Sequence, residues 1–191
     1  MPDGSIIQRM MPKRAPVTRP QSDEYAPYYE KYVSLIASDD ILGVLESQRV
    51  QMAQLLAARS DREGNFRYAL DKWSVKEIIG HICDAERIFA YRMLRIGRGD
   101  KTPLAGFEQD DYIPTGNFNA RTLAELAAEF AAVRVATITL VQSLPQEAWT
   151  RAGTASNNPV SARALAYIIA GHEMHHRRIL DEKYFPAIPR A

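Results

Sequence analysis

The histidines of this chain are the residues whose type and spacing point most directly to chemistry. All four lie in two short segments, residues 80–86 and 171–177. His172 and His176 are four residues apart, so on a helix they lie on the same face, one turn apart, and can bind one metal ion. His81 is available as a third ligand from the other segment. The spacing predicts a metal centre in an otherwise plain helical protein.

The helix that carries three of these histidines can be examined on a helical wheel. His172 and His176 fall in the middle of its apolar stripe, whereas His175 falls at the edge and is expected to have a supporting or structural role. Buried imidazoles without partners cost about 1–3 kcal/mol per unsatisfied group, and a metal ion removes that cost. The alternative, in which the histidines bond to one another, to carboxylates or to water, stays open.

His81 lies beside the apolar stripe of its own helix, a place where a histidine is often an ordinary boundary residue. It is favoured as a ligand because metal sites in bundles use facing helices and no other histidine is left to complete a set of three. Cys83 lies about 200° away around the helix, and we interpret it as a small buried apolar residue and not as a nucleophile. Glu86 and Glu173 are candidate hydrogen-bond acceptors without an assigned catalytic role.

Four long segments must position these residues. Each has apolar residues at three- and four-residue spacing, which is typical of amphipathic helices. Ser74 with Glu77, and Thr122 with Glu125, form capping boxes that open the second and third helices. With no convincing series of strands, the pattern predicts an all-α fold, a four-helix bundle. The expected helices cover about residues 39–59, 74–96, 122–144 and 161–184.

The connection over residues 98–118 is longer than a turn between bundle helices needs. Long ordered loops in compact domains are often functional, so we expect this one to form the wall or lid of a site. Asp110, Asp111 and Tyr112 are its candidate pocket residues. The alternative is a plain crossover that lets two helices run parallel, and the two interpretations are compatible.

Composition limits the classes of function and partner. The 191 residues suffice for one domain with a sizeable core. Lysine plus arginine number 24 against 23 for aspartate plus glutamate, so the chain lacks the basic field that nucleic-acid binding needs. No segment approaches the ~18 to 20 apolar residues of a membrane span, and the start does not resemble a signal peptide. The single cysteine, Cys83, allows no internal disulfide, and we expect a cytoplasmic protein.

The N-terminal region differs in composition from the rest. Residues 1–27 contain five prolines among scattered basic residues, which disfavours regular structure. We predict a flexible or surface-wrapped arm there, followed by one bundle domain over residues 28–191. Tyr28, Tyr29 and Tyr32 form an aromatic entry segment, either extended or a short helix, that could support a homodimer.

The combined pattern resembles the DinB/YfiT-like family of proposed metalloenzymes. The resemblance rests on residues 73–82, on residues 84–87, and on residues 172–176 together with Ile179. It covers about residues 39–185, nearly the whole globular part of the chain. A histidine in the second helix combined with a terminal HxxxH is a fairly specific signature.

The resemblance implies a four-helix bundle with a long crossover and a divalent metal ion held near one end by three histidines. Carried over residue by residue, the ligands are His81, His172 and His176. Some members of the family are S-transferases or isomerases that use low-molecular-weight thiols, and others are called hydrolases.

These expectations describe a metal-dependent enzyme that acts on a small molecule, either as a hydrolase or as a thiol-dependent S-transferase. Three histidine ligands leave a coordination position for water or substrate, as in catalytic metal sites. Zinc and nickel suit imidazole ligands best, with iron and manganese as alternatives. A second hypothesis is a metal-stabilised helical binding or stress-response module without turnover, and a third is a metal-free bundle.

Overall fold

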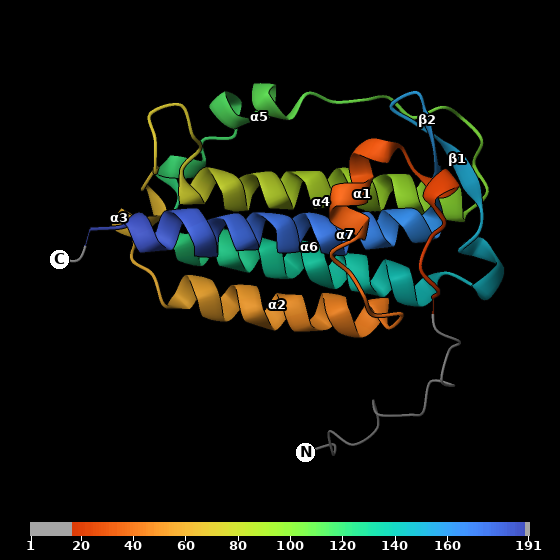
Figure 1. The fold of residues 1–191 in the computed structure, drawn as a ribbon, viewed down its shortest axis with the longest axis horizontal. Helices are drawn as coiled ribbons and strands as arrows, with labels where there is room; N and C mark the ends of the chain where they lie inside the picture. Colours follow the sequence, from red (N-terminus) through yellow and green to blue (C-terminus); the bar gives the residue numbers. More distant parts are fainter. Residues whose placement is uncertain (1–16, 190–191) are drawn as a thin grey trace, which may run out of the picture.

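The fold is the predicted all-α four-helix bundle. A computed structural model describes residues 17–189, so most of the predicted arm lies outside the described residues. Its four long helices are α2 (Ile41–Ala57), α4 (Val75–Gly97), α6 (Leu123–Ser143) and α7 (Ala162–Ile179), and they lie side by side in Figure 1. Shorter helices are α1 (Glu30–Val33), α3 (Asp61–Gly64) and α5 (Gln109–Thr115), with 3-10 turns at Ser22–Glu24, Pro27–Tyr29, Phe118–Ala120, Gln146–Ala148 and Phe185–Ala187, and a π-helical turn at Leu180–Tyr184.

The capping boxes begin the two helices for which they were predicted. The Ser74 hydroxyl accepts from the Glu77 amide at 3.1 Å, and the Glu77 carboxylate accepts from the Ser74 amide at 2.7 Å. Thr122 and Glu125 make the same reciprocal pair at the start of α6. Each box satisfies backbone donors that the first turn of a helix leaves free, and this confirms the predicted starts of α4 and α6.

The long crossover makes α4 and α6 parallel neighbours. Each of these helices also packs on α7 or α2, which gives the order α2, α6, α4, α7 around the bundle (Figure 1). Arg87 in the middle of α4 pairs with Glu129 in the first half of α6, and Arg98 donates to Ser143 where both helices end. The expectation that the loop allows two helices to run parallel is therefore confirmed, while α7 runs antiparallel to α4.

A short hairpin, missed in the sequence, closes the end of the bundle where α4 ends and α7 begins. Strands β1 (Ala152–Ala155) and β2 (Asn158–Ser161) pair antiparallel around a turn in which Ser156 and Asn157 have positive φ angles of 49° and 61°. Leu104 of the crossover forms a bridge with Ala155. The hairpin thereby ties the first part of the crossover to the bundle.

The described part of the N-terminal region lies along the start of α7. Glu24 accepts from the Ser161 hydroxyl at 2.6 Å and from Arg163 Nε at 2.7 Å. The buried Tyr167 donates its hydroxyl to the Val17 carbonyl at 2.9 Å. These contacts lead the chain into the tyrosine-rich segment that covers the middle of α7.

A polar layer crosses the apolar core and joins all four long helices. Arg134 on α6 is fully buried and donates to both Glu86 oxygens on α4 and to Gln48 Oε1 on α2. Gln48 in turn donates to the Ala170 carbonyl on α7 at 2.8 Å. Apolar side chains fill the space on both sides of this layer. Among the described residues, no helix has the length and apolar character needed to cross a membrane.

Candidate metal centre

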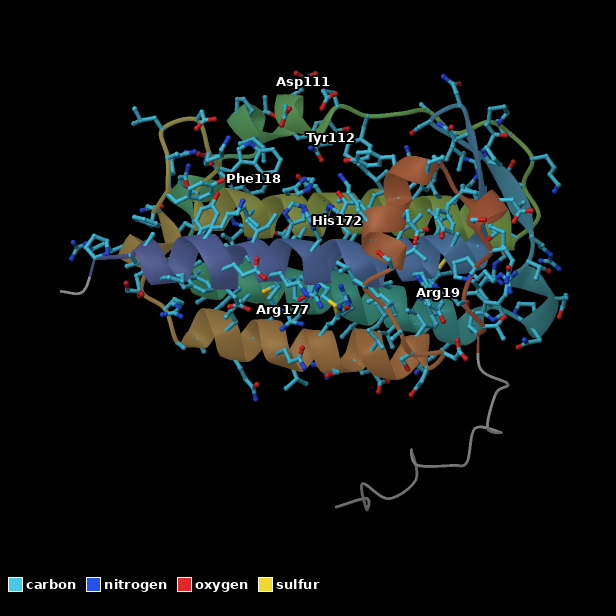
Figure 2. The ribbon with its side chains drawn as sticks, in the orientation of Figure 1. Arg19, Asp111, Tyr112, Phe118, His172 and Arg177 are labelled. Atoms are coloured by element: carbon cyan, nitrogen blue, oxygen red, sulfur yellow. The ribbon has the colours of Figure 1, made fainter. Side chains whose placement is uncertain are left out.

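Three histidines from two antiparallel helices meet inside the bundle. His81 extends from α4, and His172 and His176 extend from successive turns of α7, where Figure 2 labels His172. The Nε2 atoms of His81 and His172 are 3.0 Å apart. One ring nitrogen from each of the three side chains lies within 4.8 Å of the others. The two histidine segments of the sequence therefore form one cluster.

Burial keeps these imidazoles in the neutral form. His81 and His172 are only 3% and 4% exposed, and burial lowers the pKa of His81 to about 4. Burial first, and the neighbouring histidines second, hold the pKa values of His172 and His176 well below the usual 6.5. Neutral imidazole is the form that binds metal ions, so the three rings are ready for a cation at neutral pH.

The fourth histidine does not join the cluster of three. His175 is half-buried and packs edge-on against Tyr32, with ring centroids 5.3 Å apart. Tyr32 also packs against His172, at 5.2 Å. This fits the supporting place that the wheel gave to His175. Cys83 is fully buried, as interpreted from the sequence, and burial raises the pKa of its thiol far above the usual range.

Two glycines allow neighbouring segments to approach the histidines closely. A side chain on Gly171 would place its Cβ 2.1 Å from the Tyr32 carbonyl oxygen, and one on Gly80 would lie 2.2 Å from the Phe118 ring. Each glycine directly precedes a histidine of the cluster. The absence of a side chain at these positions lets α1 and the end of the crossover cover the cluster.

A cavity of about 350 Å³ borders the cluster on the side of α1 and the crossover. His81 and His172 lie in its wall. The remaining wall is mostly aromatic, with a few polar groups, the composition usual for small-molecule sites. It is formed by Tyr28, Tyr29 and Tyr32 before and in α1, by Ala85 and Phe89 of α4, by Phe107, Glu108 and Gln109 of the crossover, and by Ser156 of the hairpin turn.

The crossover supplies a wall of the cavity, but with residues other than those expected. Asp110, Asp111 and Tyr112 are exposed and do not line it. They belong to α5, which lies above the bundle in Figure 2, apart from His172. Glu108 caps α5 by accepting from the Asp110 amide. The two residues before α5 and its first residue, Gln109, therefore line the cavity, whereas the predicted pocket residues face solvent.

His176 borders a second, smaller hollow of about 270 Å³ between the start of α4 and the end of α7, beside Trp73 and Tyr184. Two larger hollows, of about 590 and 670 Å³, lie away from the histidines. One adjoins α3 and the C-terminal segment, and the other lies between α2 and α6. Neither brings metal-binding side chains together, so the cavity beside the cluster is the better candidate for a site.

The donor set fits a divalent transition-metal ion. Two nitrogens that share one tetrahedral ion lie about 3.3 Å apart, which is close to the 3.0 Å between His81 and His172. All three donors are imidazole nitrogens, which suit zinc, nickel, copper and iron and suit magnesium or calcium poorly. The residues present therefore match the metal predicted from the sequence.

Two buried charged residues on the helices that carry the cluster were not expected from the sequence. Glu173 is fully buried; its Oε1 accepts from Arg177 at 3.1 Å and its Oε2 has no hydrogen-bond partner among the described residues. Burial raises the pKa of Glu173 to about 7, although Arg177 opposes the shift. Arg92 on α4 is 2% exposed. Helical spacing could have placed both near the apolar faces, but their charge argued for exposure.

Comparisons with known proteins agree with this description. The DinB superfamily model matches residues 45–180, and curated protein sequences give no match. Among solved structures, YfiT from Bacillus subtilis, described as a probable metal-dependent hydrolase with an unusual four-helix bundle topology, is 15% identical with a TM-score of 0.68; the match covers 75% of this chain and 83% of YfiT. A mycothiol-dependent maleylpyruvate isomerase is 13% identical with a TM-score of 0.62, over 76% of this chain and 61% of the isomerase. Since the family model spans most of the sequence, the chain belongs to the DinB superfamily.

Proposed function

We propose that this protein is a metal-dependent enzyme in which His81, His172 and His176 hold a divalent ion and a small-molecule substrate occupies the adjacent cavity. The observation that carries the proposal is the convergence of three neutral imidazoles, two of which, those of His81 and His172, lie in the wall of that cavity. A bound ion would act as a Lewis acid that lowers the pKa of a water molecule or a thiol, and so supply a nucleophile at neutral pH.

Aromatic side chains of the protein would shape the site and exclude water from it. Tyr32 and Phe89 pack edge-on against His172, with ring centroids 5.2 and 5.8 Å away, and Trp73 packs against His81 at 4.9 Å. These rings fix the imidazoles in place and exclude water from their surroundings. Glu108 brings a carboxylate to the cavity wall, where it can accept a proton from the nucleophile.

Two reactions are compatible with this site, hydrolysis and transfer involving a low-molecular-weight thiol. One structural relative is described as a hydrolase and another as a mycothiol-dependent isomerase. A metal-stabilised binding module without turnover is less well supported, because an ion with a purely structural role needs no cavity beside it. Zinc and nickel are the proposed ions, with iron and manganese as alternatives. The cytoplasmic location and the homodimer stay predictions.

Metal analysis of the purified protein tests the site. We expect about one zinc or nickel ion per chain in the wild type and a loss of most of it in His81→Ala, His172→Ala and His176→Ala, since each removes a ligand. His175→Ala is the matched control, because it removes a neighbouring imidazole outside the cluster and should retain the ion. Stoichiometric metal in all three ligand variants would exclude this centre.

Activity assays then separate the two reactions. The metal-loaded protein is tested with activated esters and amides, and with thiols plus an electrophile. Each activity should disappear on chelation and return on metal addition, and it should be absent in His172→Ala. A protein that binds metal at the three histidines and turns over neither class of substrate would support the binding module instead.

A further inference from the structure

Arg92 is a buried cation without a carboxylate partner. Arg92 is 2% exposed, and it takes part in none of the ion pairs among residues 17–189. Its guanidinium donates through Nη2 to the Ala105 carbonyl at 2.7 Å and to the Ser156 hydroxyl at 3.0 Å. These neutral partners hold the group in place and supply no negative charge. A buried charge normally has a partner of opposite sign, because its removal from water is costly.

The other buried cations of the described chain show the usual arrangement. Arg134 donates to both oxygens of Glu86, with the shortest contact at 2.8 Å. Lys76, 3% exposed, lies 3.4 Å from an Asp61 oxygen. Arg92 is thus the exception, and its position explains where a partner could come from.

Several residues that contact Arg92 also line the cavity beside the histidine cluster. Ser156, which accepts its hydrogen bond, lies in the cavity wall, as do Phe89 and Phe107, whose ring centroids are 6.0 and 5.7 Å from the guanidinium carbon. Tyr29, also in the wall, has its pKa raised by burial and lowered in part by the nearby Arg92 charge. Arg92 therefore lies directly behind one end of the cavity.

The charges around the cavity favour an anion. The bordering histidines are neutral, and Lys31 adds a positive charge 3.8 Å from the ring centroid of Tyr28, a residue of the wall. Glu108 is the negative side chain in the wall, and its carboxylate also caps the start of α5. A divalent ion on three neutral ligands would add two further positive charges, so the filled site would have a large positive excess without an anionic ligand.

We infer that this cavity binds a substrate with an acidic group, of the carboxylate class, at its Arg92 end. The Ser156 and Tyr29 hydroxyls face that group and the Arg92 charge stabilises it, while the reacting group lies at the histidines. His81 and Arg92 are eleven residues apart on α4, which is about 16 Å along the helix axis. A long side chain on a helix points back toward the N-terminus, so the Arg92 side chain covers part of this distance and the substrate spans the rest. The substrate is therefore elongated. This inference rests on the proposed function for the reacting end only.

Hexanoate and the neutral hexanamide, which have the same length, are suitable probes of the acidic end. Their affinities are measured by NMR titration of the metal-free and the zinc-loaded protein. We expect hexanoate to bind at least about tenfold more tightly than hexanamide, because charge-assisted hydrogen bonds are about twice as strong as neutral ones. Amide signals of Ala105 and Ser156 should shift. Equal affinities for the two probes would overturn the inference.

Variants test whether Arg92 is responsible. Arg92→Met should remove the preference for hexanoate and Arg92→Lys should retain part of it, whereas Arg95→Met, which removes an arginine one turn along the same helix, should leave it unchanged. Ser156→Ala keeps the Arg92 charge and should reduce the preference for hexanoate about two- to fivefold. This variant tests the inference if Arg92→Met does not fold. A preference that survives in a folded Arg92→Met protein would contradict the inference.

The same measurements separate this inference from the proposed function. If the protein binds no metal, yet prefers hexanoate in an Arg92-dependent way, the anion site is supported and the proposed metal-dependent enzyme is excluded. If the protein binds zinc at the histidines and shows no preference for hexanoate over hexanamide, the metal centre is supported and the anion site is excluded.

Discussion

Gly171 lies next to the candidate metal ligand His172, at the point where α1 packs against α7. Its missing side chain allows the Tyr32 carbonyl to approach the α7 backbone beside His172. Gly171→Ala would force Cβ to 2.1 Å from that oxygen, so α1 must move away. We expect the free energy of unfolding, measured by urea denaturation, to fall by about 1–3 kcal/mol.

The matched control for that substitution is Gly106→Ala. Its added Cβ would lie 3.4 Å from the Ser156 hydroxyl, an ordinary contact, and the expected change is within about 0.5 kcal/mol. The two variants make the same chemical change, so equal effects would show that the close approach of α1 to α7 has no energetic weight.

Glu77 makes the start of α4 sensitive to acid. Its carboxylate accepts from the Ser74 amide, Arg67 and Asn119, and these bonds, chiefly the one from Arg67, outweigh burial and lower its pKa below the usual 4.5. Because the folded state holds the proton less tightly than the unfolded state, the resulting stabilisation is complete above about pH 4.5 and is lost as the pH falls through the folded pKa.

Glu77→Gln tests this directly in metal-free protein. Glutamine keeps an acceptor for the cap but cannot titrate, so the variant should be less stable at pH 7 by about 1 kcal/mol, and the gap should close as the pH falls below the usual 4.5 and through the lowered pKa of Glu77. Urea unfolding of both proteins at several pH values measures the gap. A gap that stays constant with pH would assign the effect to packing and not to charge.

At the scale of single residues, the sequence predicted which side chains share a helix face better than it predicted which charged side chains are buried. The wheel brought His172 and His176 to one face and left His175 at the edge, because helical geometry alone decides this. Burial of Arg92 and Glu173 was missed, since exposure is the usual state of a charged side chain and burial depends on partners that are distant in sequence. The expected pocket residues were wrong for a similar reason, because the short helix α5 turns them outward.

At the scale of elements, the polar layer around Arg134 links the four helices in one register. Arg134→Met leaves Glu86 buried without its counter-charge, and we expect a loss of about 3–5 kcal/mol in unfolding free energy. Arg134→Met combined with Glu86→Leu removes both charges and should recover most of that loss, because an apolar replacement of a buried ion pair is often neutral.

Arg98→Met is the control for the same chemical change on an exposed arginine, and its effect should stay within about 0.5 kcal/mol. Urea denaturation of the wild type, of Arg134→Met, of Glu86→Leu and of the double variant gives the coupling between Arg134 and Glu86. A double variant that is as unstable as Arg134→Met alone would mean that the layer acts through Gln48 and not through the ion pair.

The elements with strong local signals were predicted, and the one without such a signal was not. Capping boxes and apolar stripes are local, so the starts of α4 and α6 and the number of bundle helices followed from the sequence. The hairpin at 152–161 has four-residue strands that contain Gly153 and Pro159, and both residues are unusual in strands. Its strands form because α4, α7 and the crossover hold them in place, which local patterns do not report.

At the scale of the whole molecule, an ion bound at the proposed centre would link two helices that are distant in sequence. Zinc at 100 times its dissociation constant would stabilise the folded protein by about 2.7 kcal/mol and raise the melting temperature by about 5–10 °C. Scanning calorimetry with and without a chelator measures the shift. His172→Ala should show almost none, and an equal shift in that variant would place the ion elsewhere.

The separation of the two halves of the centre also sets when it can assemble during synthesis. His172 follows His81 by 91 residues, and at roughly 5–20 residues per second the ribosome needs about 5–18 s to make that stretch. Throughout this interval α4 carries one proposed ligand without its partners, because both of the others lie on α7. A growing chain therefore cannot bind an ion at the three histidines before α7 has been made, so metal loading would follow the synthesis of all four bundle helices.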